Sequence, residues 1–196
     1  MFYSIKNSMK KKLWVIGFAS ALCLSACGTG KEVEAEAAKI VEAVENKDMK
    51  AVEQMIMGTG DFIADEELAG FFTETESENN GIIAKIIAQD SVEMKKVTDE
   101  HIVYEISAPE LSNIFQDVMK EENITAETFE DYIYNYIETA EKVKIEVEVP
   151  YTYENEVFKA DYDTSEFMNA ITGNLITAYQ GLIEQMIQEN GGGSAE

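Results

Sequence analysis

The chain has 196 residues; 45% are hydrophobic, 38 are acidic and 15 are basic, which gives a formal net charge of −23. This length suits one domain, and the ordinary hydrophobic fraction argues against a disordered acidic chain. The negative excess excludes a general nucleic-acid-binding protein, because phosphate recognition depends on lysine and arginine. It also argues against a domain that docks directly on anionic lipid. One histidine, two cysteines and one tryptophan leave few residues for metal or nucleophile chemistry.

The first 26 residues have the composition of an export signal. Every basic residue of the chain is a lysine, and four lie in the first twelve residues: Lys6, Lys10, Lys11 and Lys12. The apolar stretch over 13–24 that follows is shorter than the roughly twenty residues that cross a bilayer as a helix. These features predict a helical signal peptide over 1–26. Met9 opens an ordinary signal sequence, so we expect residues 1–8 to be an upstream extension.

The sequence Leu24-Ser25-Ala26-Cys27 at the end of this stretch resembles the lipobox of bacterial lipoproteins, in which small residues precede an obligatory cysteine. The resemblance implies that signal peptidase II recognises Leu24, Ser25 and Ala26 and cuts before Cys27. The Cys27 sulfur would then carry a diacylglyceryl group, and two acyl chains suffice for lasting anchoring. The alternative is an incidental cysteine after an ordinary signal peptide. It is disfavoured because the box, the basic start and the apolar stretch are in register. We expect a protein held by lipid on the extracytoplasmic face of the cell membrane.

The part of the chain that follows the signal differs sharply from it in charge. From Cys27 onward there are 11 lysines and 38 acidic residues, a net charge of −27, and no second cysteine. We expect residues 27–30 to form the lipidated N-terminus and a short tether, 31–190 a single domain, and 191–196 a flexible tail. Such a charge keeps a tethered domain soluble and repels it from anionic lipid.

Helical periodicity recurs along the domain. The apolar pattern predicts a helix over 31–57 with a break at 45–48, a short helix over 61–72, and either a helix or a strand over 82–87. Pro109 is expected in the first turn of a further helix that buries Leu111 to Met119 on one face. Thr125 is expected to cap another helix, which extends to Ala140. After a capping box over 163–166, one long helix is predicted from Phe167 to Ile187.

Two segments have the alternation and turn chemistry of β-hairpins. The first joins 92–97 to 102–107, and the second joins 143–153 to 157–162 through a turn at 154–156. Two hairpins can pair into a four-stranded antiparallel sheet with helices over one face. The predicted fold class is therefore α+β.

This arrangement is similar to small lipoproteins of Gram-positive bacteria, a family of unknown function whose exported domains look NTF2-like or cystatin-like. The resemblance rests on Asn46-Lys47-Asp48-Met49, on the hairpin over 92–107, and on the run from Val157 to Leu175. Two additional helices between the hairpins distinguish this chain from a compact NTF2-like cone. The resemblance implies an NTF2-like or cystatin-like domain on a lipid anchor.

Residues with catalytic or metal-binding chemistry are sparse. His101 lies at a predicted turn, where a solvated histidine is the favoured interpretation. The segment from Asp161 to Ser165 resembles the start of a calcium loop, but Glu166 and Thr172 occupy the positions that need glycine and glutamate. Helix capping explains this segment better, and the acidic clusters fit a solvated surface. We expect no catalytic residue, no metal ion and no cofactor.

Three tyrosines are candidate ligand-facing residues. Tyr151 and Tyr153 share one face of a strand, and Tyr134 points away from the apolar face of its helix. A tyrosine-lined open sheet face could bind a peptide or a glycan. The alternative, which we favour, is that helices cover this face.

These observations favour a non-catalytic binding or interaction module at the cell envelope. Its expected partners are the membrane, through lipid on Cys27, and an envelope protein or peptide, with no nucleic acid. The alternative is an NTF2-like small-ligand carrier or enzyme with a pocket between sheet and helices.

Overall fold

The computed structural model describes residues 29–57, 81–121 and 124–191. In these residues the chain is α+β, as expected, with a four-stranded antiparallel sheet and seven helices. The signal peptide, the residues Leu24 to Cys27, the helix predicted over 61–72 and residues 192–196 of the predicted tail lie outside them. Thr29 and Gly30, expected in the tether, belong to the first helix, and Gly191, expected in the tail over 191–196, ends the last one. The elements are α1 (Thr29–Glu45), α2 (Met49–Met57), α4 (Ile82–Ile87), β1 (Ser91–Val97), β2 (His101–Pro109), α5 (Ile114–Lys120), α6 (Ala126–Thr139), β3 (Lys142–Glu154), β4 (Val157–Ala160), α7 (Ser165–Ile171) and α8 (Leu175–Gly191).

The sheet has the strand order β1-β2-β3-β4, and every neighbouring pair is antiparallel. The two predicted hairpins, β1–β2 and β3–β4, are joined by the pairing of β2 with β3, in which Tyr104 lies opposite Val147. Asn155 and Glu156 connect β3 to β4, with φ of 52° and 66°. Positive φ at both central residues is typical of the two-residue hairpin turn whose twist matches that of the strands. The two-hairpin prediction is confirmed.

Strand β1 contains a bulge that its sequence pattern conceals. Met94 pairs with Tyr104 and Lys96 pairs with Val103, which leaves Lys95 as an extra residue. The extra residue brings Val97 onto the same side of the sheet as Met94, although three positions separate them. Lysines and a bulge on an edge strand also discourage pairing with a foreign strand.

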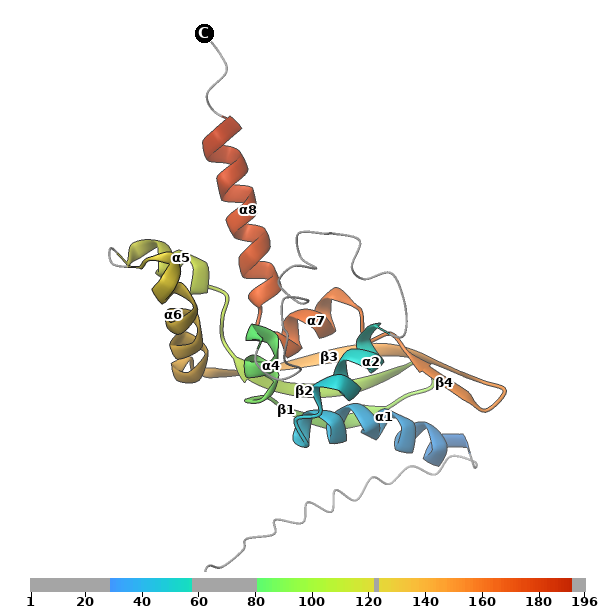
Figure 1. Ribbon diagram of the computed structural model, residues 1–196. Helices are drawn as coiled ribbons and strands as arrows, with labels where there is room; N and C mark the ends of the chain where they lie inside the picture. The colour runs from blue at the N-terminus through green and yellow to red at the C-terminus, as the bar shows by residue number, and fades with distance from the viewer. Residues whose placement is uncertain (1–28, 58–80, 122–123, 192–196) are drawn as a thin grey trace, which may run out of the picture.

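Helices cover one face of the sheet, as predicted (Figure 1). Tyr104 shows this best: its hydroxyl donates to the Ala37 carbonyl of α1, and its ring lies 6.3 Å from that of Phe167 in α7. The opposite face is exposed and charged, with Lys144 donating to Glu105 at 2.6 Å. The core under the helices includes Ile40, Val44, Val52, Ile102, Ile106, Val147, Val149 and Ile171.

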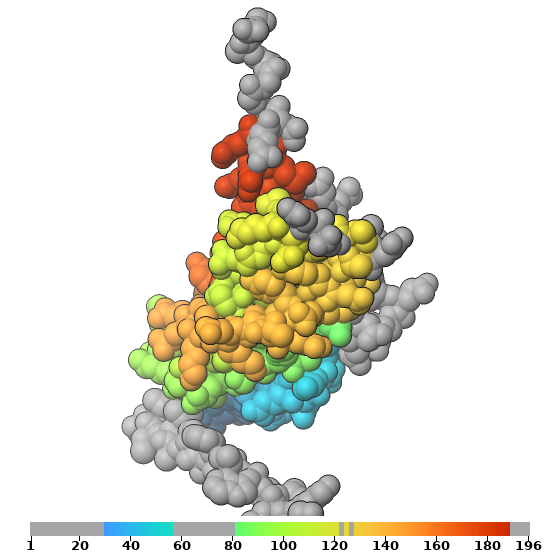
Figure 2. Space-filling view, turned by 90° about the vertical axis from the view of Figure 1, so that its left-hand side faces the viewer, coloured from blue at the N-terminus to red at the C-terminus, as the bar shows by residue number. Residues whose placement is uncertain are grey.

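A second apolar cluster lies beyond the end of the sheet where β2 ends and β3 begins. Helices α4, α5, α6 and the first part of α8 build it, and partly buried Ile83 packs against both clusters. Figures 1 and 2 show α5 and α6 together at one side of the molecule and the far half of α8 projecting beyond them. The buried members are Ile86, Leu111, Ile114, Phe115, Ile133, Ile137 and Leu175.

The predicted start of the helix after β2 was wrong. Pro109 is the last residue of β2, where it lies opposite Lys142, and α5 begins only at Ile114. The strand continues because Ala108 is fully buried with the other inward residues of β2. A proline is tolerated at a strand end, where its missing N–H breaks no further ladder bond. Met119, expected on the buried helix face, is 54% exposed.

The single long C-terminal helix was also wrong, because two helices occupy this segment. Helix α7 ends at Ile171 and α8 begins at Leu175, and between them Gly173 and Asn174 adopt φ of 59° and 64°. Both are left-handed conformations that glycine and asparagine accept most readily. The predicted capping box is a simpler cap, in which the Thr164 hydroxyl accepts from the Phe167 amide at 3.3 Å.

Several other boundaries agree with the prediction, although β4 ends at Ala160 and not at residue 162. The break at 45–48 is present, with Lys47 at φ 56° and the Asp48 carboxylate accepting from the Ala51 amide at 3.0 Å. Residues 82–87, which the pattern left open, are helical. Thr125 caps α6, with its amide donating to the Thr128 hydroxyl at 2.9 Å.

Candidate functional site

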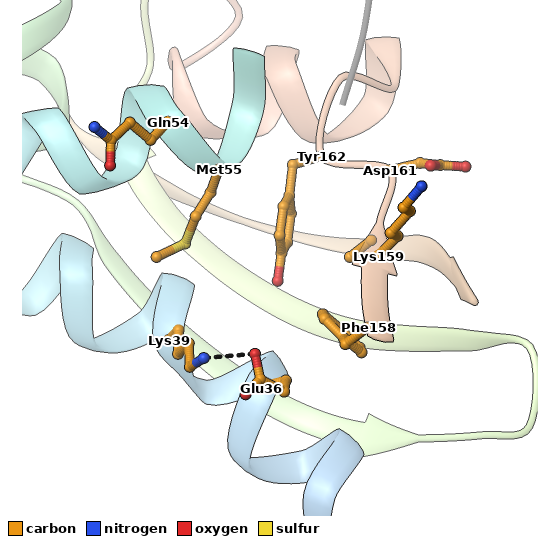
Figure 3. A pocket seen from close by; sticks show the side chains of 9 residues that line it. Glu36, Lys39, Gln54, Met55, Phe158, Lys159, Asp161 and Tyr162 are labelled. Carbon is orange, nitrogen blue, oxygen red and sulfur yellow. Dashed lines mark hydrogen bonds and ion pairs between the residues drawn. The ribbon is translucent and has the colours of Figure 1, made fainter. Parts of the chain in front are cut away.

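An open cleft of about 360 Å³ lies between α1, α2 and the strand β4 (Figure 3). This volume is in the range of small-ligand sites. Neither of the two sequence-predicted hairpin tyrosines lines the cleft. The lining residues are Glu36, Lys39, Gln54, Met55, Phe158, Lys159, Ala160, Asp161 and Tyr162.

The helical walls follow from the periodicity of α1 and α2. Ala37 and Ile40 are fully buried against the sheet, so Glu36 and Lys39 stand at the flank of the buried face. The left-handed residue Lys47 reverses the chain between the helices. This reversal lets α2 pack on α1 and places Met55 above the cleft.

The wall formed by β4 follows from strand alternation. Phe158 and Ala160 alternate along β4 and therefore lie on one side of the strand. Tyr162, two positions beyond Ala160, lines the same cleft. The Phe158 ring stacks on that of Tyr151, with centroids 5.6 Å apart and planes at 27°. An aromatic surface therefore continues from the cleft into the core beneath it.

Tyr162 forms the inner end of the cleft, with only 4% of its surface exposed. Its hydroxyl lies 3.1 Å from that of Tyr104, which in turn donates to the Ala37 carbonyl at 2.8 Å. A phenol has one proton, so Tyr162 is the donor to Tyr104. Burial raises the pKa of Tyr162 to about 12, and burial followed by the nearby Tyr162 raises that of Tyr104 further. Both side chains are therefore neutral phenols at physiological pH.

Charged groups of both signs border the apolar part of the cleft. Lys39 and Glu36 form an ion pair at 2.5 Å on α1, with side chains 54% and 40% exposed. Across from them, Lys159 and Asp161 lie at the edge of the cleft (Figure 3). The arrangement can hold an apolar group against Met55 and the aromatic rings while charged groups contact the rim.

The predicted ligand-facing tyrosines are not brought together. Tyr151 donates to the Thr98 carbonyl at 2.7 Å, and Tyr153 donates to the Glu32 carboxylate of α1 at 2.5 Å. Both lie on the helix-covered face of the sheet, the arrangement we favoured over an open tyrosine-lined face. Tyr134 lies on α6, with the Lys85 ammonium 4.3 Å from its ring centroid. Whether any of the three contacts a ligand stays a prediction.

His101 lies at the start of β2, on the exposed face of the sheet and away from the cleft. Its Nε2 is 3.6 Å from the Glu148 carboxylate. Within residues 29–57, 81–121 and 124–191, no three histidine, cysteine, aspartate or glutamate side chains are close enough to hold a metal ion. None of the described helices has the length and hydrophobicity to cross a membrane.

A buried carboxylate lies at a second position, between α4 and β1. Both carboxylate oxygens of Asp90 are inaccessible and have no hydrogen-bond partner in the described structure. Burial raises the pKa of Asp90 to about 8, and the charge of Lys142 lowers it by less. The Lys142 ammonium instead donates to the Gln89 carbonyl at 2.5 Å. Asp90 does not line the cleft, and its contribution concerns stability.

The sequence analysis missed the cleft residues Phe158 and Tyr162 as a pair. The available signal was the alternation of Phe158, Ala160 and Tyr162, which places the two rings on one side of the chain. What alternation does not reveal is which helix lies opposite. The contribution of Glu36, Lys39 and Met55 depends on how α1 and α2 pack over β4, which is a tertiary property.

Comparisons with models of protein families, with curated proteins and with solved structures give no match to this chain. The lipobox and the likeness to NTF2-like or cystatin-like lipoproteins stay predictions from the sequence. Arguments about function therefore rest on the sequence signal and on the cleft.

Proposed function

We propose that this protein is a cell-envelope lipoprotein, anchored by lipid on Cys27 at the extracytoplasmic face of the cell membrane. We further propose that its domain is a non-catalytic binding module whose ligand occupies the cleft between α1, α2 and β4. The observation that carries the binding proposal is the composition of that cleft. An apolar wall of Met55, Phe158 and Tyr162 is bordered by charges of both signs.

The cleft favours binding over catalysis because the tyrosine hydroxyls at its inner end are in unreactive states. The raised pKa values of Tyr104 and Tyr162 keep both hydroxyls protonated, and each already takes part in a hydrogen bond. Lys39 is paired with Glu36, which suits it to a charged contact with a ligand. A general base or a nucleophile would need the opposite tuning.

A small-ligand carrier, in the manner of NTF2-like proteins, is the second candidate. One observation favours it: the cleft lies between helices and sheet and has a volume suited to a small molecule. A carrier would bind a compact molecule with a one-to-one stoichiometry. A module for a protein or peptide would bind a larger partner that extends beyond the cleft.

The anchor is tested by metabolic labelling with an alkyne analogue of palmitate. We expect the label on the full chain and on Cys23→Ser, and its loss in Cys27→Ser, since these are the two cysteines of the chain. In membrane fractionation we expect the full chain and Cys23→Ser in the membrane fraction and Cys27→Ser outside it. Label retained by Cys27→Ser would refute the lipid anchor.

The cleft is tested with 1-anilinonaphthalene-8-sulfonate, an apolar anionic probe that suits an aromatic wall bordered by lysines. We expect one saturable site, weakened at least fivefold by Met55→Asp and by Lys159→Glu. Val157→Asp is the control, because Val157 is 53% exposed and does not line the cleft. Thermal melts confirm that each variant is folded. Equal binding by all four proteins would overturn the proposed site.

A further inference from the structure

The first helix begins almost at the cysteine that we propose to be lipidated. Only Gly28 separates Cys27 from Thr29, the first residue of α1. Two residues of extended chain span at most about 7 Å, and a helix rises about 1.5 Å per residue. The backbones of Glu36 and Lys39 therefore lie within about 18 Å and about 22 Å of Cys27. This limit holds at any angle between α1 and the membrane.

The wall of the cleft that β4 forms lies at the same end of the molecule as the start of α1. The hydrogen bond from Tyr153 to Glu32 ties the β3–β4 hairpin to the start of α1. In Figure 1 the turn of this hairpin and the start of α1 lie on one side, and the far half of α8 projects from the other. The view in Figure 2 likewise separates α1 from the far half of α8. The short tether thus limits how far the cleft can lie from the bilayer, and the far half of α8 projects from another side of the domain.

The charge of the domain narrows the class of ligand available at that surface. With a net charge of −27 from Cys27 onward, the domain repels lipids that carry net negative charge. A zwitterionic headgroup has no net charge to repel. On the α1 side the cleft offers the Lys39 ammonium for a phosphate and the Glu36 carboxylate for an amine, and Lys159 and Asp161 lie at its outer edge. Met55 and Phe158 offer apolar contact for the adjoining glycerol and first acyl carbons.

We propose that the cleft takes the headgroup of a zwitterionic aminophospholipid from the membrane that carries the anchor. This inference rests on the proposed function, since it requires both the lipid on Cys27 and the cleft as the ligand site. Anchoring within about 22 Å makes a lipid of the same leaflet the most concentrated ligand that the cleft can meet. A short tether is then part of the recognition and not only an attachment.

The position of the cleft is tested by energy transfer from the lipidated protein to acceptor-labelled lipid in vesicles. Donors are placed on Val157→Cys and on Ile187→Cys, which are exposed apolar positions on the hairpin and on α8. The chain offers no other free thiol after Cys27. We expect at least threefold higher transfer efficiency from position 157, and a decrease there when twenty Gly/Ser residues are inserted after Gly28. Equal transfer from both positions would refute the membrane-proximal cleft.

The ligand is tested by photocrosslinking in phosphatidylcholine vesicles that contain phosphatidylethanolamine with a photoreactive group near the headgroup. We expect crosslinks at Met55 or Phe158, reduced at least fivefold by Lys159→Glu and by the inserted linker. Lys96→Glu is the charge-matched control, because Lys96 is exposed on β1 and lies outside the cleft. Crosslinks that are absent, or equal in both variants, would overturn the proposal. Flotation with the vesicles shows separately whether the anchor is present, and the sulfonate probe shows whether the cleft binds at all.

Discussion

At the scale of single residues, Asp90 couples the stability of the fold to pH. Its pKa is about 8 in the folded protein, against 3.8 for an exposed aspartate, because burial disfavours the charged form. Between these two values the folded chain binds more protons than the unfolded chain. The free energy of unfolding therefore decreases as pH rises from about 4 to about 8, by about 1.4 kcal/mol per pH unit. Above pH 8 this contribution is constant.

Replacing Asp90 by asparagine should remove that slope, because the amide has nearly the same shape and no charge to desolvate. We expect Asp90→Asn to gain stability over the unmodified protein progressively from pH 4 to pH 8, by several kcal/mol at the upper end. Urea unfolding at pH 4, 6 and 8 measures the difference. Asp99→Asn, in the exposed turn between β1 and β2, is the control that should show no such trend. Parallel pH profiles for Asp90→Asn and the unmodified protein would contradict the assignment.

The two buried tyrosine hydroxyls should differ in their contribution to stability. Tyr104→Phe removes the bonds to both Ala37 and Tyr162, whereas Tyr162→Phe removes only one of them. A net contribution of about 1 kcal/mol per hydrogen bond predicts losses of about 2 and about 1 kcal/mol. Urea unfolding of the two variants measures this order. The reverse order would mean that Tyr162 has a further partner.

At the scale of elements, the break between α7 and α8 depends on Gly173. A Cβ at this position would lie 1.9 Å from the backbone oxygen of Pro109, and the residue has φ of 59°. The Leu111 amide also donates to the Gly173 carbonyl at 2.8 Å, so the break is part of the contact with the end of β2. Gly173→Ala should destabilise the fold by about 3 kcal/mol or more, through strain and a displaced backbone.

Gly181 is the matched control for this substitution. It lies in the exposed part of α8, with no atom within 4 Å of an added Cβ. Gly181→Ala should therefore stabilise the helix by up to about 1 kcal/mol, because alanine has the higher helix propensity. Thermal unfolding of both variants tests the contrast. A small effect of Gly173→Ala would mean that the α7–α8 break can be closed without disturbing β2.

Element prediction succeeded where the periodicity was local and failed where a long-range contact decided the boundary. The alternation over 143–149 and the turn at 154–156 predicted β3 and β4 from local signals alone. The long C-terminal helix was mispredicted because its apolar pattern continues through Gly173. At the break Gly173 lies against the backbone of Pro109 from β2, a contact that the apolar pattern does not reveal. The bulge at Lys95 was hidden for a similar reason, since its evidence is the register with β2.

At the scale of the whole molecule, the class of fold was predictable and the site was not. Amphipathic segments and two hairpins suffice to predict helices over one face of a four-stranded sheet. The site required knowledge of which helix faces which strand. Tyr151 and Tyr153 were chosen because their spacing is visible in the sequence, yet their hydroxyls bond to Thr98 and to Glu32. Met55 and Lys39 meet Phe158 only through packing.

The charge of the whole domain should make its stability increase with salt. From Cys27 onward 38 acidic residues face 11 lysines, so repulsion within the folded domain outweighs its attractions. The described ion pairs are too few to reverse this balance, and pairs as exposed as Lys39–Glu36 contribute little. Screening at 0.15 M reduces the range of charge interactions to about 8 Å and relieves repulsion more than it weakens these pairs.

The midpoint of thermal unfolding should therefore rise by a few degrees between 10 and 150 mM NaCl at pH 7. This shift corresponds to a gain of roughly 1 kcal/mol in the free energy of unfolding. Scanning calorimetry measures the shift, and potassium glutamate in place of NaCl controls for specific chloride binding. A midpoint that fell with salt would mean that attractive pairs dominate the surface and that the acidic excess lies outside the folded part.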